Sequence, residues 1–143
     1  MTPPPSSSTS GNVLLLLSGP NLNLLGTREP TIYGTATLDD HVASAQQTAG
    51  DRGYALEHLQ SNSEQTIVDA IHSARSHYAG IIINPGAFTH YAWAIADALS
   101  AYSGPSWNFT SPTPKPVSRG ATLPSCLRSR WAPSLDLAGL ATL

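Results

Sequence analysis

The chain alternates between short apolar runs and stretches in which apolar residues recur every three or four positions. Residues 13–17 (VLLLL) form a continuous apolar run, which is typical of a strand covered on both faces. Residues 80–84 (GIIIN) form a second run, rich in β-branched residues and stopped by Pro85 and Gly86. Between these runs, residues 55–61 alternate weakly and predict a further strand.

Helical spacing follows each predicted strand. Thr37 is expected to cap a helix, with Asp40 three residues later completing a capping box. Ser63 is expected to cap a second helix, and Thr89 a third that runs to about Tyr102. The apolar positions of the three helices are Leu38, Val42, Ala45 and Ala49; Ile67, Ile71, Ala74 and Tyr78; and Ile95 and Leu99.

Strands that alternate with helices predict an α/β fold with a parallel sheet and right-handed crossovers. Ligands of such sheets bind beside the carboxyl ends of the strands. The loop of residues 18–34 follows the first predicted strand, and another loop follows the third; both contain asparagine next to proline and glycine. Asn21 and Asn84 are therefore expected to lie near one crevice, although this placement names no substrate.

The character of the chain changes after Pro105. Residues 1–105 hold three arginines, no lysine and eight acidic residues, whereas residues 106–143 hold four basic residues, one acidic residue and five prolines. We therefore expect one domain over residues 12–105, with a sheet of three strands, followed by an irregular segment. Residues 1–11 are a Pro/Ser/Thr tract and are expected to be a disordered tail.

Charge and cysteine content argue against several functions. A net charge of −2 gives no electrostatic support for binding nucleic acid or an acidic membrane surface. The single cysteine, Cys126, excludes an internal disulfide and a multi-cysteine metal site. The run at 13–17 is too short for a membrane span and lacks the basic flank of a signal peptide, so a cytoplasmic location is expected.

Arg28 and Tyr33 lie in the long loop after the first predicted strand. A guanidinium lowers the pKa of a nearby tyrosine because its positive charge favours the phenolate, which makes the tyrosine a candidate general base. The alternative is a surface arginine and a loop tyrosine packed on a neighbour.

His90 lies at the expected start of the third helix, where it could donate to an anionic substrate. A capping or solvent-facing histidine fits the position equally well. The remaining histidines show no spacing that indicates a metal site and are interpreted as structural: His41, His58, His72 and His77. The only lysine is Lys115 in the irregular segment, which excludes Schiff-base catalysis by a lysine of the folded part.

Three segments together resemble type II 3-dehydroquinate dehydratase. They are LLLLSGPNLNLLGTREPTIYG at 14–34, LQSNSEQTIVDAIHSA at 59–74 and IIINPGAFTHYAWAIADAL at 81–99. The resemblance covers residues 13–105, and the form GTREPxIYG is most similar to fungal members, which often serve quinate catabolism. It implies a flavodoxin-like three-layer fold, no cofactor, and a homododecamer built from trimers in which Asp97 reaches a neighbouring subunit's site.

The resemblance also implies a reaction. 3-Dehydroquinate would lose water by anti elimination through an enolate, giving 3-dehydroshikimate, in quinate catabolism or the shikimate pathway. Tyr33 matches the base that removes a C2 proton, Arg28 the arginine that keeps it ionised, and Asn21 the residue that stabilises the enolate through a water. The positions that match substrate-binding residues are Asn84, His90 and Asp97.

The chain departs from the family pattern at three places. Ser18 replaces the usual asparagine, and Tyr91-Ala92 replaces a Thr-Ser pair. After Pro105 the family continues with a strand like VVELHISN, an arginine-containing stretch, then VGxIAGLG and a final helix, none of which is present. The family's glutamate, general-acid histidine and carboxylate-binding arginine therefore have no counterpart.

The genetic code offers an explanation for the last departure. Read from the last base of codon 106, the codons of Trp107 and Asn108 force a glutamate within a permitted Val-Glu-Leu-His-Ile. In the same register residues 131–138 permit Val-Gly-Ala-Ile-Ala-Gly-Leu-Gly. We interpret residues 106–143 as the family's C-terminus read in a shifted frame, which sequencing the transcript across this junction tests.

A non-catalytic module that binds a small anion and a non-functional gene product remain the alternatives to an enzyme.

Overall fold

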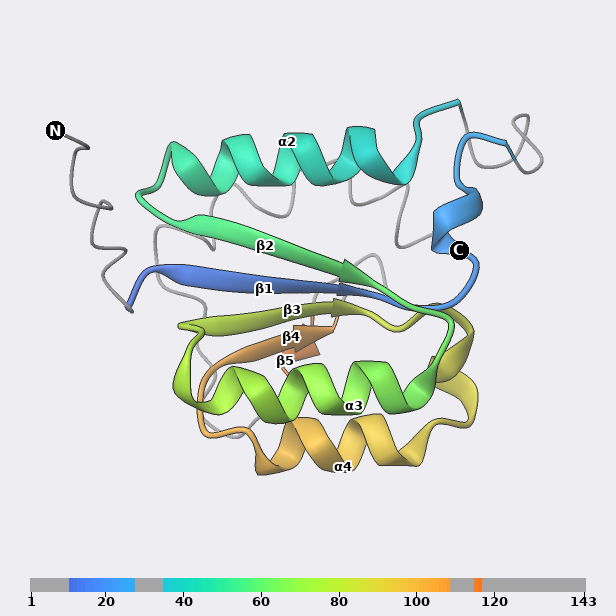
Figure 1. The fold of residues 1–143 in the computed structure, drawn as a ribbon, viewed down its shortest axis with the longest axis vertical. Coiled ribbons are helices and arrows are strands. Elements are labelled where there is room, and N and C mark those ends of the chain that lie inside the picture. The colour runs from blue at the N-terminus through green and yellow to red at the C-terminus, as the bar shows by residue number, and fades with distance from the viewer. Residues whose placement is uncertain (1–10, 28–34, 109–114, 117–143) are drawn as a thin grey trace, which may run out of the picture.

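The computed structural model of the chain describes residues 11–27, 35–108 and 115–116. It has three layers: the helix α2 (Leu38–Gly50) covers one face of a sheet, and α3 (Glu64–Ser73) and α4 (Trp93–Ala101) cover the other (Figure 1). The tail expected at the N-terminus falls almost wholly outside the described residues.

The strand β1 (Val13–Ser18) is an interior strand of the sheet and is buried along its whole length, as its continuous apolar run predicts. It pairs in parallel with β2 (Ala55–Gln60) on one side and with β3 (Gly80–Asn84) on the other. β4 (Ser106–Asn108) pairs in parallel with β3, and β5 (Lys115–Pro116) is antiparallel to β4. The parallel order β2-β1-β3-β4 is that of flavodoxin-like folds, which confirms the predicted fold class.

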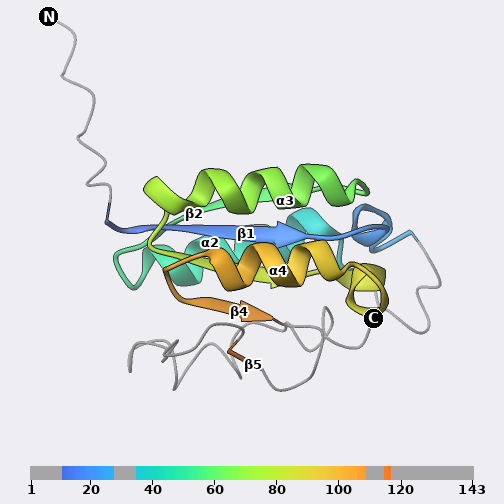
Figure 2. The ribbon, with the colours of Figure 1, turned by 90° about the horizontal axis from the view of Figure 1, so that it is seen from below.

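The prediction that the sheet ends after three strands is wrong. Ser106 is aligned with Ile81 in a parallel ladder, and the Ile81 backbone N–H donates to the Pro105 carbonyl at 3.0 Å. Trp107 is buried within the apolar cluster on the α2 face. A strand of three residues is too short to show an alternation of buried and exposed side chains. Its formation therefore depends on backbone pairing with the edge of β3 and not on a pattern in the sequence. Figure 2 shows β4 with β5 beside it, and α3 and α4 side by side across one face of the sheet.

Both predicted caps of the first two helices are confirmed. The Thr37 side chain accepts from the Asp40 N–H at 3.2 Å, and the Thr37 N–H donates to the Asp40 carboxylate at 2.9 Å. Ser63 Oγ accepts from a backbone N–H in the first turn of α3 at 3.3 Å. These caps satisfy donors that the helix itself cannot pair.

The third helix starts later than Thr89, so that predicted cap is wrong. The 3-10 turn η3 (Gly86–His90) comes first, and Ala92 is the N-cap of α4. The Thr89 hydroxyl donates to the Gly86 carbonyl at 2.7 Å and therefore closes the 3-10 turn. A threonine hydroxyl that bonds a carbonyl behind it has the opposite role to an N-cap oxygen, which accepts from an N–H ahead of it.

Two apolar clusters hold the layers together, one on each face of the sheet. Successive side chains of a strand point to opposite faces, so Leu14 and Leu16 join the α2 cluster and Leu15 and Leu17 the α3–α4 cluster. All the apolar helix positions predicted from the sequence are buried except Tyr78, which is partly buried and lies after the 3-10 turn η2 (Ala74–Ser76).

Two buried side-chain atoms have no hydrogen-bond partner among the described residues. They are Ser106 Oγ and Trp107 Nε1, in the two residues that begin β4. We predict that Trp107→Phe changes the free energy of unfolding by less than about 1 kcal/mol, because removing an unpaired buried N–H offsets part of the lost apolar contact. Trp107→Ala should lower it by about 3–5 kcal/mol because it leaves a cavity. Urea unfolding of the two variants checks this, and equal destabilisation by both would contradict it.

Candidate active site

Three polar residues lie level with one another where β1, β2 and β3 end. Ser18 is aligned with Gln60 on one side and with Asn84 on the other. The Gly19 N–H donates to the Asn84 carbonyl at 2.8 Å, so the loops that leave β1 and β3 start side by side. The loops that carry Asn21 and Asn84 are thus neighbours, as the strand order predicts.

Two glycines let these loops approach each other so closely. A Cβ on Gly19 would lie 2.1 Å from the Pro85 carbonyl oxygen, a distance at which atoms overlap. Gly86 has a φ of 55°, and a Cβ there would lie 3.2 Å from the Pro20 carbonyl oxygen. The Gly-Pro-Asn and Asn-Pro-Gly segments therefore fit together only because their glycines have no side chains.

Asn84 is buried, with 3% of its surface exposed, and its Oδ1 accepts from the Gly86 N–H at 3.1 Å. This bond fixes the orientation of the carboxamide at the end of β3, because the oxygen must face the following turn.

Asn21 is exposed and has a left-handed backbone, with φ 66° and ψ −4°. Asparagine adopts this conformation more readily than most residues. It is the N-cap of the 3-10 turn η1 (Leu22–Leu24), and its backbone N–H donates to Asn62 Oδ1 at 3.0 Å. Asn62 and Gln60 are not among the site residues predicted from the sequence, although the polar run QSNS (60–63) at the end of the strand predicted over residues 55–61 is a signal for them.

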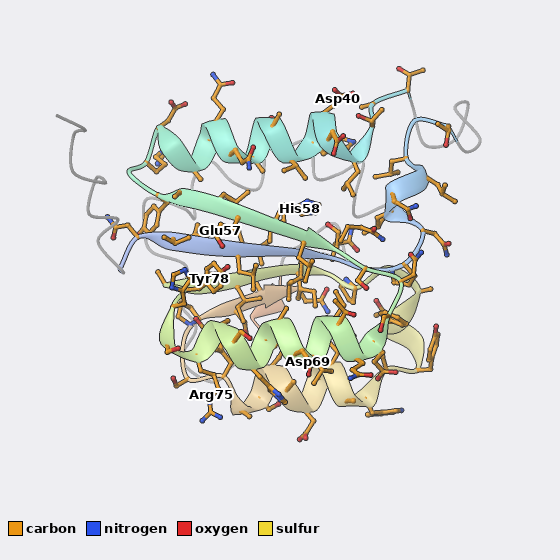
Figure 3. All side chains as sticks on the ribbon, in the orientation of Figure 1. Asp40, Glu57, His58, Asp69, Arg75 and Tyr78 are labelled. Carbon is orange, nitrogen blue, oxygen red and sulfur yellow. The ribbon has the colours of Figure 1, made fainter. Side chains whose placement is uncertain are left out.

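Ser18 and His58 share a hydrogen bond of 3.0 Å between Oγ and Nε2 behind this edge of the sheet. Ser18 is 1% exposed, and His58 is partly buried on the α2 side of β2 (Figure 3). Burial lowers the pKa of His58, and the negative charge of Asp39 opposes this shift. The serine is too deeply buried to attack a substrate, so the pair has a structural role, as expected for His58.

A second perturbed group lies away from the strand ends. Tyr78 follows η2, and its hydroxyl donates to the Glu57 carboxylate in the middle of β2 (Figure 3). Burial raises the pKa of Tyr78 to about 12, and the hydrogen bond and the charge of Glu57 add to the shift. A phenol that keeps its proton in this way cannot be a base near neutral pH, so Tyr78 does not compete with Tyr33 for that role.

The remaining predicted site residues are only partly covered by the structure. Arg28 and Tyr33 fall outside the described residues, and so do the side chains of His90 and Lys115. The backbone of His90 ends η3, which begins directly after β3 and Pro85, and Asp97 is exposed on α4. The roles expected for these residues therefore stay predictions.

In the described part of the chain no group of three or more His, Cys, Asp or Glu residues is placed to hold a metal ion. No helix within the same residues is long and apolar enough to cross a membrane.

The fold and the polar strand ends define a flavodoxin-like α/β protein with a candidate ligand site at the carboxyl edge of its sheet. Residues 12–108 match the family described as dehydroquinase class II. The chain belongs to this family.

Two curated relatives and one solved structure illustrate the relationship. The catabolic 3-dehydroquinase of Aspergillus clavatus is 58% identical over 95 residues, which are 66% of this chain and 63% of the relative. The 3-dehydroquinate dehydratase of Cereibacter sphaeroides is 50% identical over 92 residues, 64% of this chain and 63% of the relative. The crystal structure of type II dehydroquinase from Butyrivibrio crossotus has a TM-score of 0.66 and 40% identity, covering 69% of this chain and 70% of that chain. This chain thus spans 63% of the length of the two curated relatives.

The lowered pKa of His58 predicts a loss of stability in mild acid. The unfolded state binds a proton near the ordinary pKa of 6.5, whereas the folded state resists protonation. The stability that His58 contributes is therefore fully present above about pH 6.5. It is lost as the pH falls from there through the lower pKa of the folded state. Urea unfolding at pH 7 and pH 5 should show a smaller decrease for His58→Gln than for the parent chain. His72→Gln, on the exposed side of α3, is the control and should keep the parent's pH dependence.

Proposed function

We propose that the chain is a type II 3-dehydroquinate dehydratase that removes water from 3-dehydroquinate to give 3-dehydroshikimate. The observation that carries this proposal is the meeting of two motifs, GPNLNLLG and INPGAFTH, through the Gly19–Asn84 hydrogen bond at the carboxyl edge of the sheet. Membership in the family and the names of the relatives, catabolic 3-dehydroquinase and 3-dehydroquinate dehydratase, support it. The physiological setting is quinate catabolism or the shikimate pathway.

The proposed reaction is an anti elimination without a metal or covalent intermediate. Tyr33, kept ionised by Arg28, removes a proton from C2, and the electron pair moves onto the carbonyl oxygen at C3 to form an enolate. Asn21 stabilises that oxygen through a water, and the enolate then expels the hydroxyl at C1. Hydrogen bonds aimed at an oxygen that gains charge during the reaction stabilise the transition state more than the substrate.

The substrate's other groups are assigned to residues around the same edge. Asn84 and His90 bind the ring hydroxyls and the region of the carboxylate. Asp97 lies on the exposed side of α4, which is where a residue must lie to reach a second subunit. We propose that the chain assembles as a trimer-based homododecamer and acts in the cytoplasm.

The acid that would protonate the leaving hydroxyl has no counterpart in the sequence. After Pro105 the chain has none of the family's motif with its glutamate, general-acid histidine and carboxylate-binding arginine. Without an acid to protonate the leaving hydroxyl, turnover should fall by about 10²–10⁴ relative to a complete enzyme. We propose that residues 12–105 form the dehydroquinase domain and residues 106–143 its frame-shifted tail. The missing acid favours one alternative, a non-catalytic module that binds a small anion beside Asn21 and Asn84.

The purified full chain mixed with 3-dehydroquinate should produce the ultraviolet absorbance of the product's conjugated enone. Tyr33→Phe should remove this signal because a phenyl ring cannot accept the C2 proton. Tyr54→Phe, between α2 and β2 at the other end of the sheet, is the control and should keep the parent rate. Binding of 3-dehydroquinate without any enone would support the anion-binding module, and absence of both would indicate a non-functional product.

A further inference from the structure

The end of β2 carries two carboxamides that the proposed chemistry does not use. Asn62 Oδ1 accepts two hydrogen bonds, from the Asn21 backbone N–H at 3.0 Å and from Gln60 Nε2 at 3.2 Å. Gln60 Nε2 also lies 3.2 Å from the Gly19 carbonyl oxygen and 3.4 Å from Asn23 Oδ1. The two side chains therefore connect the end of β2 to the loop that holds Asn21, across about forty residues of sequence.

These bonds act on the backbone of Asn21 rather than on its side chain. The N–H is held by Asn62, and the carbonyl oxygen accepts from the Leu24 N–H at 3.0 Å. With both peptide groups held, the left-handed conformation is fixed, and only χ1 and χ2 remain to direct the carboxamide. Because Asn21 is exposed, packing cannot supply this direction, so it must come from the backbone.

Asn62 is itself anchored on both sides in sequence. The Ser61 N–H donates to the Ser18 carbonyl at 3.0 Å, which continues the ladder between β1 and β2 by one residue. The Ser63 N–H donates to Ser61 Oγ at 2.9 Å, and Ser63 then caps α3. Asn62 thus lies between the end of a strand and the start of a helix. Because both elements are rigid, its side chain can fix the position of the loop that it contacts.

We propose that Asn62, oriented by Gln60, is a positioning residue that fixes Asn21 for stabilisation of the enolate. This inference rests on the dehydratase function proposed above. Asn62 acts only as an acceptor in the contact with Asn21, so a side chain of the same shape without an oxygen cannot replace it. The bonds from Asn62 to Asn21 and to Gln60 are exposed, and an exposed hydrogen bond contributes little to stability. Its loss should therefore affect the placement of Asn21 more than folding.

The test uses the full chain with Asn62→Leu, which keeps the size of the side chain and removes the acceptor. Asn62→Asp keeps an oxygen that can accept from Asn21 and Gln60. Asn12→Leu, exposed just before β1, is the matched control. Two quantities are measured: hydrogen exchange of the Asn21 backbone amide, and kcat and KM for 3-dehydroquinate.

We expect Asn62→Leu to speed exchange of the Asn21 amide and to lower kcat by about 10–100-fold, the scale of a misplaced catalytic group, with KM changed less than about twofold. Asn21→Ala should lower kcat similarly, and the double variant should be no worse than either single one because both act through the same group. Asn62→Asp should restore slow exchange and most of kcat, and Asn12→Leu should match the parent.

Each contrary outcome has its own meaning. Unchanged exchange in Asn62→Leu overturns the inference whatever the turnover. A parent chain that does not convert 3-dehydroquinate, whether or not it binds it, refutes the proposed function, and the role of Asn62 falls with it. Turnover in the parent with an unchanged kcat in Asn62→Leu overturns the inference alone and leaves the dehydratase function standing.

Discussion

The structure of the candidate site depends on the contact between the ends of β1 and β3. The Gly19 N–H donates to the Asn84 carbonyl, and Gly19 approaches the Pro85 carbonyl so closely that no side chain fits. This contact extends the parallel ladder by one residue and then forces both chains to turn. The ends of these two strands therefore set the positions of the segments that follow them. These segments are the loop with the left-handed Asn21 and the η3 turn that begins at Gly86. Glycine is required here by distance as well as by backbone angle.

β2 completes the site by holding the same loop from the other side. Its last residue, Gln60, donates to the Gly19 carbonyl, while the next N–H, of Ser61, donates to the Ser18 carbonyl. The loop after β1 is therefore bound by β3 through its N–H and by β2 through its carbonyl oxygen. A loop bound at both peptide groups can carry an exposed asparagine in a defined direction without burying it. The loop after β1 is held in this way because β1 has a parallel neighbour on each side.

The features that were predictable from the sequence are those that depend on nearby residues. The buried run of β1 and the Thr37–Asp40 capping box are local, and both are confirmed. The predicted cap at Thr89 is wrong because a threonine serves a 3-10 turn and a helix N-cap equally well, and the carbonyl of Gly86 is what places it in the turn. The QSNS run marks a polar strand end, but the contact of Asn62 with Asn21 cannot be predicted from it, because the two residues lie 41 positions apart in the sequence. β4 is not predicted because its three residues are too few to show an alternation of buried and exposed side chains.

The short strand β4 joins this sheet chiefly through its backbone. Parallel pairing uses the N–H and carbonyl groups that every residue except proline provides, so the edge of β3 can pair with residues 106–108 whatever their side chains. Side chains are less tolerant: the position of Trp107 lies within the α2-face cluster, and burial there leaves its indole N–H unpaired among the described residues. Ser106 Oγ and Trp107 Nε1 are both buried without a partner among the described residues, so at this edge the backbone ladder is satisfied while the side chains of β4 are not.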